Sequence, residues 1–554
     1  MRKGSYYIVL AILMLWPAVQ SQASITGQEP RIVNMIYFVR FLEPRDPLIT
    51  PDTLFKATER SADQLEKYGL EGTFLLQYDA LIAPNYQMLM RKLREKGNDI
   101  GAWWEITEPH VKAAGMEWRG RYPWDWHVNV GFSSGYTIQE REKLVDVYMS
   151  EFRKIFGEYP TSIGSWFIDA HTIRYFYEKY NIQAVCICRD QIGTDGYTFW
   201  GGYWNQAFYP SRYNCYMPAQ TKENQIPVPV FRMLGSDPAY QYDSGIGNNV
   251  QGVITLEPVY PESGGSKEWV EWFFKSMFTD PALGFNYVQA GQENSFTWSA
   301  MKDGLSIQVP LIADYAKNGI IKVETLTQSG QWYRKKYPLT ASTALSALSD
   351  YRAEDRKTVW YNSRFYRANM IWKGDEFAIR DIHLFDEQFR SKYYDRPTSS
   401  TQCVFMTLPF LDGFLWSTKD EHSQMRIAIE DENGTWSYAK CANPVVATDN
   451  EDLVVVECPL NQGGKAVFSF ERHRISVKVS GTGKWKLELY APLAERIPFK
   501  TIQRQNLKAA FEDFEYQIQL QKGEFGKPSS CSEKGYFLDI IPQSNQIRML
   551  MSKR

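Results

Sequence analysis

The sequence predicts a mixed α/β chain in which a (β/α)7-8 barrel is followed by an antiparallel β-sandwich. From residue 32 to about 345, apolar strand-like runs alternate with amphipathic helical runs, which is typical of a parallel sheet covered by helices. Past residue 350, short alternating runs are separated by turn residues, which is typical of antiparallel sheets. A chain of 554 residues is also too long for one hydrophobic core.

The first region contains seven or eight strand–helix units. Ile32–Phe41 is apolar and β-branched, and it precedes a helical run at Thr53–Tyr68, with Asp52 as the expected N-cap and Gly69 as the stop. Further strands are expected at Gly72–Tyr78, Asp99–Glu105, Ser162–Phe167, Gln183–Cys188, Pro229–Leu234, Gly252–Leu256, Phe285–Gln289 and Ile320–Leu326. Further helices are expected at Tyr86–Lys96, Glu140–Phe156, Thr172–Tyr180, Lys267–Phe278 and Leu305–Ala316. This many units in about 300 residues favours closure into a barrel.

The second region is predicted to be all β. Its short runs lie at Phe377–Phe385, Gln402–Leu408, Gln424–Ile429, Thr435–Tyr438, Leu453–Glu457, Ala466–Phe470, Ile475–Val479 and Trp485–Tyr490. Asn433-Gly434 and Gly481-Thr482-Gly483 are turn sequences between them. The predicted domains are therefore a signal peptide at 1–23, a barrel at 30–345 and a β-sandwich at 350–554.

The first residues match the sequence pattern of an export signal. Arg2 and Lys3 are basic, Tyr7–Trp16 is apolar, and Ser21-Gln22-Ala23 is a small-x-small cleavage site. The apolar run is too short for a membrane span, and no second long apolar stretch follows. The sequence therefore predicts a soluble protein of the periplasm or the exterior, without a membrane span.

Composition narrows the partners. With 62 basic and 64 acidic residues the formal net charge is −2, which gives no electrostatic footprint for nucleic acid. Aromatic residues make up 15% of the chain, and aromatic rings can stack on the C–H faces of sugars. We therefore expect a glycan or a small carbohydrate as substrate.

Carboxylates recur at the ends of the predicted strands. Barrel proteins build their sites at the carboxyl ends of the strands. The acidic residues at or after these ends are Glu43, Asp79, Glu105, Asp169, Asp190, Asp237, Glu257 and Glu293. Glycoside hydrolysis needs one protonated carboxyl group and one ionised carboxylate. From the sequence we assign Glu105 and Asp169 as the catalytic pair, with Glu293 and Glu257 as further candidates.

Residues for binding a sugar are expected in the loops after the third and fifth strands. These loops mix aromatic rings with acids and with amides, which both donate and accept hydrogen bonds. The predicted substrate-binding residues are Trp104, Trp118, Asp125, His127, His171, Asp190, Trp200 and Asn205.

A metal site is the alternative for the same region. His110, His127 and His171 fall within the predicted barrel, and three His residues with a nearby acid can bind Zn²⁺. Their spacing fits no compact helical motif such as HExxH. From the sequence we therefore assign no metal ligand and no cofactor, and a bound divalent metal is kept as an alternative.

Three segments resemble the glycoside hydrolase/deacetylase superfamily. They are Leu65–Phe74 (LEKYGLEGTF), Arg94–Gly101 (REKGNDIG) and Phe176–Ile182 (FYEKYNI), and they follow one another in the order of that superfamily. The resemblance implies a barrel, usually of seven strands. The deacetylase metal triad is not carried over, because Val39–Glu43 and Trp103–Glu108 stand where its motifs belong.

A closer resemblance covers nearly the whole chain after the signal. The run from Trp118-Arg119-Gly120-Arg121 to Trp204-Asn205-Gln206 looks like a gut-bacterial family of two consecutive domains of unknown function. Three hypotheses follow. The first is a glycoside hydrolase that uses paired carboxylates at the barrel mouth. The others are a metal-dependent polysaccharide deacetylase-like hydrolase and a non-catalytic glycan-binding protein.

Overall fold

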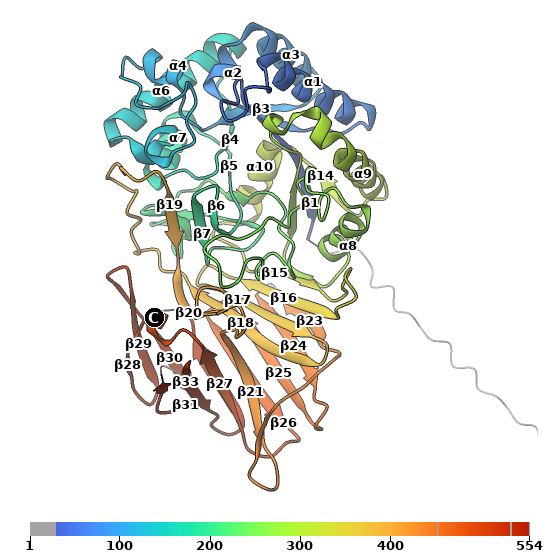
Figure 1. The fold of residues 1–554 in the computed structure, drawn as a ribbon, viewed down its shortest axis with the longest axis vertical. Coiled ribbons are helices and arrows are strands. Elements are labelled where there is room, and N and C mark those ends of the chain that lie inside the picture. Colours follow the sequence, from blue (N-terminus) through green and yellow to red (C-terminus); the bar gives the residue numbers. More distant parts are fainter. Residues whose placement is uncertain (1–28, 451, 532–534, 553–554) are drawn as a thin grey trace, which may run out of the picture.

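The computed structural model describes residues 29–450, 452–531 and 535–552. Figure 1 shows a first region, blue to green, in which helices surround a sheet, and a second region, yellow to red, made of long strands. The predicted signal peptide lies outside the described residues. Within the described part of the chain, no helix is long and apolar enough to cross a membrane.

Seven parallel strands form a curled sheet in the order β13-β1-β2-β3-β4-β5-β11. β8 continues the path antiparallel to β11, and β14 pairs with β1. The strands are β1 Arg31–Val39, β2 Thr73–Leu76, β3 Asp99–Trp103, β4 Ser162–Gly164, β5 Ala184–Ile187, β8 Ala207–Phe208, β11 Val230–Arg232, β13 Asn286–Ala290 and β14 Lys322–Val323. The α/β class with a parallel sheet is thus confirmed.

Helices connect most of these strands. They are α1 Pro51–Lys67, α2 Tyr78–Ile82, α3 Pro84–Glu95, α4 Glu108–Ala113, α5 Val128–Gly131, α6 Ile138–Phe156, α7 Ala170–Tyr180, α8 Lys267–Phe278, α9 Thr297–Lys317 and α10 Leu326–Lys336. α6 shows why they form where they do. Thr137 and Glu140 make a reciprocal capping box at its start, and Gly157 adopts the left-handed conformation that ends it.

Four sequence predictions need correction. Thr50, not Asp52, caps α1, because Pro51 occupies the first helical position. α9 starts eight residues before the predicted Leu305 and continues through Pro310. Gly252–Leu256 forms no strand, because the amide of Leu256 bonds to the carbonyls of Leu234 and Gly235. The strand predicted at Ile320–Leu326 is only the two residues of β14, since α10 begins at Leu326.

Small strands between β5 and β11 tie the first region to the second. β6 Gln191–Thr194 and β7 Tyr197–Trp200 pair with each other, and β9 Pro210–Ser211 pairs with β10 Asn214–Pro218. β19 Cys403–Met406 comes from the second region and pairs in parallel with β7. In Figure 1 this strand reaches from the yellow and orange strands toward β6 and β7.

Two antiparallel sheets make up the second region. The larger contains β12 Ala282–Leu283, β15 Thr343–Ala347, β16 Arg356–Asn362, β17 Tyr366–Lys373, β18 Glu376–Leu384, β20 Leu408–Asp412, β21 Gln424–Glu430, β22 Trp436–Tyr438, β27 Trp485–Ala491, β31 Glu524–Phe525, β32 Ser529–Cys531 and β33 Gly535–Ile541. The smaller contains β23 Val445–Asn450, β24 Leu453–Pro459, β25 Lys465–Glu471, β26 Arg474–Ser480, β28 Phe499–Ile502, β29 Asn506–Phe511, β30 Phe514–Lys522 and β34 Gln546–Leu550. Rings from the two sheets pack together, as Tyr361 does with Phe470.

Candidate active site at the carboxyl ends of the parallel strands

Arg40 joins two of the predicted catalytic carboxylates. It follows β1 directly, and its guanidinium binds Glu105, after β3, through two hydrogen bonds of 3.0 and 2.8 Å. Its Nη1 also donates to Glu293, which follows β13. β13, β1, β2 and β3 are consecutive in the sheet, so their carboxyl ends bring these residues together.

Surrounding side chains fix Arg40 in place. Its guanidinium lies over the ring of Trp124 at 4.3 Å, and Ser295 accepts a hydrogen bond of 3.1 Å from Nη1. Gln77, after β2, donates to Glu105 at 2.5 Å. Burial opposes the charge on Arg40, but Glu105 and Glu293 together raise the pKa of Arg40 above its ordinary value. Glu105, which is 1% exposed, is therefore committed to this ion pair.

Glu257 differs because no cation among the described residues binds it directly. Thr255 and Gln292 donate to its carboxyl group at 2.8 and 3.1 Å, and both donors are neutral. Burial raises the pKa of Glu257, and the nearby charge of Glu293 raises it further, while Arg189 acts in the opposite direction. Burial also raises the pKa of Glu293, against the lowering effect of Arg40.

Counting charges separates the roles of these acids. We call Glu43, Glu105, Glu257, Glu293, Arg40, Arg45 and Arg189 the mouth cluster, since each lies at or after the end of a strand or in the loop next to it. Four carboxyl groups face three guanidinium groups. Among the described residues, Glu43 is paired with Arg45, and Glu105 and Glu293 are paired with Arg40, whereas Glu257 is bound by neutral donors. Burial, which raises the pKa of Glu257, therefore acts there without a directly bound cation to oppose it.

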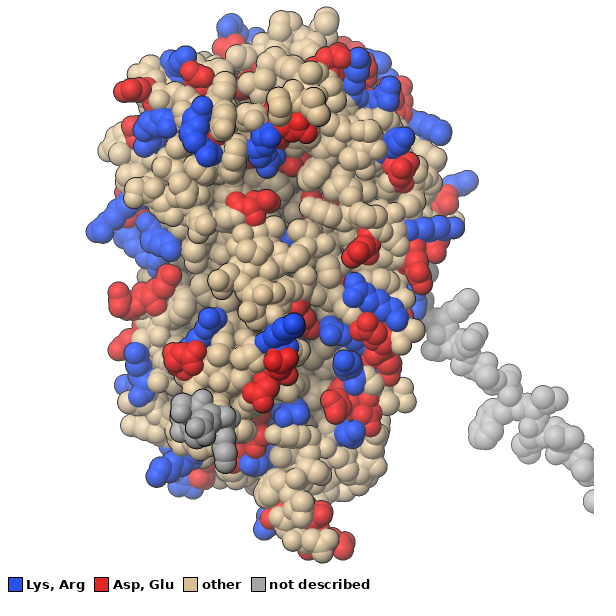
Figure 2. Space-filling model, in the orientation of Figure 1, with Lys and Arg blue, Asp and Glu red and all other residues tan. Residues whose placement is uncertain are grey.

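The mouth cluster is enclosed but not sealed. Glu257 and Glu293 are each 5% exposed. On the face drawn in Figure 2, acidic and basic side chains are intermixed. Glu257 and Glu293 are thus two nearly buried carboxyl groups with different partners, neutral donors for Glu257 and a guanidinium for Glu293.

Asp169 lies outside this cluster. Its side chain caps α7, accepting from the amide and hydroxyl of Thr172. It also accepts from Ser133 at 2.7 Å and pairs with buried Arg141 at 2.9 Å. Both oxygens are occupied by these bonds, so this geometry gives Asp169 a structural role and does not unite it with Glu105.

The loop residues after β3 border the cluster at different depths. Of these loop residues, Trp124 places its ring against the Arg40 guanidinium, and the Arg45 guanidinium lies over the ring of Trp126. Asp125 is held by Arg121, and although burial opposes it, this bond lowers the pKa of Asp125 to about 2. Other predicted residues of this part are half-buried or paired elsewhere: Trp118 bonds to the carbonyl of Tyr122, His127 lies 3.8 Å from Asp125, and His171 contacts Glu142 at 2.9 Å.

Two more predicted binding residues, and one histidine considered for a metal site, point elsewhere. Trp104 is fully buried and packs against His110 and Phe176, so it belongs to the core. Asn205 is nearly buried and donates to the carbonyl of Ser236. His110 is also core, where burial lowers the pKa of its imidazole to about 4.

Asp190 and Trp200 belong to a second charged cluster between the two regions. Asp190 accepts from Arg232 of β11 and from Arg367 of β17, and Arg367 also binds Asp381 at 2.7 Å. Trp200 donates to Asp412 at 2.8 Å. We call Asp190, Arg232, Arg367, Asp381, His383 and Asp412 the sealed network, because every member is at most 3% exposed.

The sealed network also holds a group with metal-ligand geometry. Among the described residues, the ligand atoms of Asp381, His383 and Asp412 lie within 4.8 Å of one another. His383 Nε2 is 3.3 Å from Asp381 and 3.4 Å from Asp412. Three acids face two arginines and this histidine, so a proton on His383 makes the charges equal. We therefore read this group as an ion-pair network.

Sequence reasoning missed the cations of the mouth cluster. Arg40 stands in an apolar run, Phe38-Val39-Arg40-Phe41, and is 2% exposed. A charged residue in such a run needs a partner, because burying an unpaired charge is costly. This was the available signal. Arg189, the second residue after β5, stands in a similar context.

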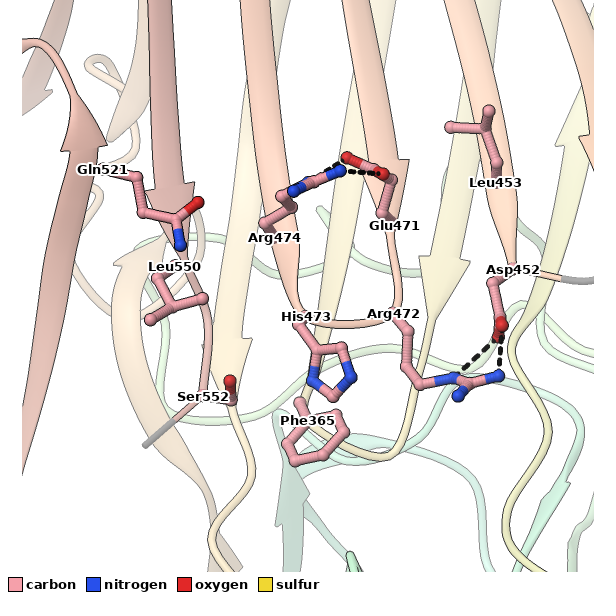
Figure 3. Close-up of a pocket in the computed structure, with 10 residues that line it drawn as sticks. All are labelled: Phe365, Asp452, Leu453, Glu471, Arg472, His473, Arg474, Gln521, Leu550 and Ser552. Carbon is pink, nitrogen blue, oxygen red and sulfur yellow. Dashed lines mark hydrogen bonds and ion pairs between the residues drawn. The ribbon is translucent and has the colours of Figure 1, made fainter. Parts of the chain in front are cut away.

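A separate cavity of about 570 Å³ lies in the second region. Figure 3 shows Phe365, Asp452, Glu471, Arg472, His473 and Arg474 on its wall, from the ends of several strands. Arg472 pairs with Asp452, and Arg474 pairs with Glu471. Each arginine here is thus matched by an acid within the wall.

The chain was compared with known proteins. No family model and no curated protein matches it. A solved protein from Parabacteroides distasonis, named for the glycoside hydrolase/deacetylase class, superposes with a TM-score of 0.52 at 16% identity, covering 69% of this chain and 91% of that one. At this identity the likeness is one of fold alone, and it agrees with the resemblance to the glycoside hydrolase/deacetylase superfamily that the sequence predicted.

Two further solved structures are more distant. 4-α-glucanotransferase from Thermococcus litoralis has a TM-score of 0.33 at 11% identity and covers 94% of this chain and 99% of its own. The catalytic domain of peptidoglycan N-acetylglucosamine deacetylase from Eubacterium rectale has a TM-score of 0.24 at 11% identity, with 55% and 94% covered. Likeness at this level carries no argument about function.

Proposed function

We propose that this protein is a carbohydrate-active hydrolase that cleaves glycosidic bonds in a glycan. The observation that carries the proposal is the pair Glu257 and Glu293, two buried carboxyl groups in one cluster of which only Glu293 binds a cation. Glycosidic cleavage needs this asymmetry, since one group must give a proton while the other is ionised.

The roles follow from the surroundings of each group. Glu257, whose pKa is raised by burial, donates a proton to the oxygen of the leaving sugar. Glu293, held next to Arg40, acts as the carboxylate that attacks the anomeric carbon or activates a water. Glu105 is a positioning residue, because it accepts two hydrogen bonds from Nε and Nη2 of Arg40, whereas Glu293 accepts from Nη1.

Deacetylation is the second candidate. The solved protein with a TM-score of 0.52 is named for both classes, and a glutamate that activates water can also attack an acetyl carbonyl. A metal-dependent deacetylase needs ligands at the mouth, and within the described residues the group with ligand geometry lies in the sealed network instead. The two candidates therefore differ in whether they need a metal at the mouth, which the screen below tests.

A turnover screen tests the proposal. The protein is incubated with a panel of nitrophenyl glycosides, plant and host glycans and acetylated sugars, with and without chelator. Release of reducing sugar that persists in chelator and disappears in Glu257→Gln supports the glycosidase. Acetate release, or activity that chelator abolishes, would replace it with the deacetylase. Glycan binding without any turnover would make the protein a lectin-like binder.

We also propose the domain organisation and the route to the exterior. Residues 30–345 would form the barrel domain and residues 350–554 the β-sandwich, supported by the change from parallel to antiparallel pairing near β15. The predicted signal at 1–23 would direct export. Limited proteolysis and the amino-terminal sequence of the protein recovered from the periplasm or medium would test both.

A further inference from the structure

A polar groove of about 640 Å³ crosses the outer face of the larger antiparallel sheet. Its walls come from β17, β18, β21, β22 and β27, and from the loop at 413–423. The volume lies within the range of small-ligand sites, roughly 300–1,000 Å³. Nothing in the mouth cluster contributes to this groove, so it is a second site.

Strand alternation explains why this face is polar. Trp372 and Met425 are buried, and the Phe377 ring packs against Trp372 and against Phe468 of the smaller sheet, so these side chains lie on the inner face. Their neighbours Lys373, Glu376 and Gln424 therefore point outward. Lys373 pairs with Glu376 in the ladder, and Gln424 pairs with Tyr490, so these residues share one surface.

The groove combines aromatic rings with groups that both donate and accept hydrogen bonds. Tyr438 and Tyr490 lie along it, with Gln424, Gln462 and Ser437 beside them. Tyr490 donates to Glu421 at 2.8 Å, and the Arg426 guanidinium lies 3.4 Å from the centre of the Tyr438 ring. Rings beside amides and hydroxyls suit a polyhydroxylated ligand, which offers C–H faces and hydroxyl groups.

The charges of the groove nearly cancel. The basic residues are Arg356, Lys373, Arg380, Arg426 and Lys440, and the acidic residues are Asp243, Glu376, Asp420 and Glu421. Five against four gives no field that would select a polyanion or a polycation. The ligand class that fits is therefore a neutral one.

The inner end of the groove holds an unsatisfied donor and an unsatisfied acceptor. Arg380 is 4% exposed and its Nη1 donates to Asp243 Oδ2 at 2.9 Å. Among the described residues, Arg380 Nη2 and Asp243 Oδ1 have no hydrogen-bond partner. Buried polar atoms of this kind are costly unless something completes them.

We propose that this groove binds a chain of neutral sugars, as a glycan-binding site separate from the mouth cluster. One connection, residues 233–266 between β11 and α8, carries both Glu257 of the mouth cluster and Asp243 of the groove. The groove would hold a second stretch of the polysaccharide that the mouth cluster cleaves. The choice of ligand class thus rests on the proposed function, whereas the site itself rests on the groove.

Binding is measured on the full chain by affinity electrophoresis in gels that contain galactomannan, arabinoxylan, mixed-linkage β-glucan or, as the acidic probe, polygalacturonate. The variants are Tyr438→Ala and Gln462→Ala, the second being exposed and thus safe for folding. Gln517→Ala, exposed on β30 of the other sheet, is the matched control. We expect at least one neutral probe to retard the wild-type protein, and each groove variant to bind about tenfold more weakly.

The same gels separate the two proposals. Glu257→Gln is expected to bind as the wild type does, because it leaves the groove intact. Groove variants are expected to keep their turnover of small nitrophenyl glycosides. The proposal that the groove binds neutral glycans would be overturned if the wild-type protein bound no neutral probe or only polygalacturonate. It would also be overturned if the groove variants bound as well as Gln517→Ala does. Loss of turnover in Glu257→Gln would still support the mouth cluster in any of these cases.

Discussion

The mouth cluster and the sealed network are made of the same kinds of residue and differ in two respects. The mouth cluster has four carboxyl groups against three guanidinium groups, and its two candidate catalytic acids are 5% exposed. The sealed network has three acids against two arginines and His383, and its members are at most 3% exposed. Burial of charge is common to both.

If the mouth cluster is the reactive site that we propose, this difference separates it from a structural ion-pair network. In the sealed network each carboxylate has a cation partner. In the mouth cluster Glu257 has none among the described residues, and it is 5% exposed. The proposal therefore rests on the unequal pairing of charges and not on burial alone.

Replacing the acids of the mouth cluster should have the largest effect. Glu257→Gln and Glu293→Gln remove the proton donor and the ionised carboxylate, and each should lower kcat by about 10²–10⁴-fold. Asp169→Asn, outside the cluster, is the control and should keep kcat within about threefold while it lowers stability through a weaker cap of α7. If Asp169→Asn were as inactive as Glu257→Gln, the catalytic pair would have to be reassigned.

Removing a cation from the sealed network should cost stability instead. Arg367→Met leaves both Asp190 and Asp381 without this partner, and breaking a buried ion pair costs about 3–5 kcal/mol. The measurement is the free energy of unfolding from urea titration. Lys373→Met, exposed on the same strand, is the control and should change that free energy by less than about 0.5 kcal/mol. A loss below 1 kcal/mol for Arg367→Met would mean that the two regions do not depend on the network.

Asp79 extends the comparison to a buried acid that has no cation partner among the described residues. Burial raises the pKa of Asp79 to about 7, although Thr107 donates to it. The folded state therefore holds its proton to a higher pH than the unfolded state, and stability falls as pH rises from about 4 through 7. Asp79→Asn removes this loss, so it should be more stable than the wild type at pH 8 by up to about 4 kcal/mol.

The check is urea unfolding of both proteins at pH 4 and pH 8. At pH 4 the carboxyl group is protonated in the folded state and roughly half ionised in the unfolded state, so titration should separate the two proteins by less than about 1 kcal/mol. An advantage of Asp79→Asn that is as large at pH 4 as at pH 8 would point to packing and not to titration. Thr107→Val, which removes the donor and keeps the shape, should deepen the loss at pH 8.

The sequence predicted the strands and the positions of the acids better than their partners. Runs such as Ile32–Phe41 are fully apolar, so β1 and the acid positions after the later strands follow from local pattern. The pairing of Arg40 with Glu105 spans 65 residues, and that of Asp190 with Arg367 spans 177. Such pairs depend on strand order and on the docking of β17 and β19, which no local pattern encodes.

The same reason explains Asp169 and Trp200. Asp169 follows a strand, as catalytic acids do, but it also stands three residues before Thr172 at a helix start, where an acid is an ordinary cap. Trp200 stands in an aromatic and amide-rich stretch that the sequence suggests as a sugar site, yet it ends strand β7 and is covered by Asp412 and Phe414 from the second region. A segment that packs against another region of the protein can therefore have the same amino-acid composition as a segment that binds a ligand.

His383 gives the smallest and most specific test of the sealed network. Burial lowers the pKa of His383, but Asp381 and Asp412 outweigh it and raise the pKa above the ordinary value. Arg367 and Tyr242 also face Asp381, and Trp200 and Thr407 complete the surroundings. A pKa raised in the folded state stabilises below the unfolded value near 6.5, and this contribution is lost as pH rises through the folded value. The difference in unfolding free energy between wild type and His383→Gln should therefore be greatest below pH 6 and shrink toward alkaline pH. A constant difference across that range would mean that His383 is neutral in the folded protein, and the equal count of charges that distinguishes the sealed network from the mouth cluster would fail.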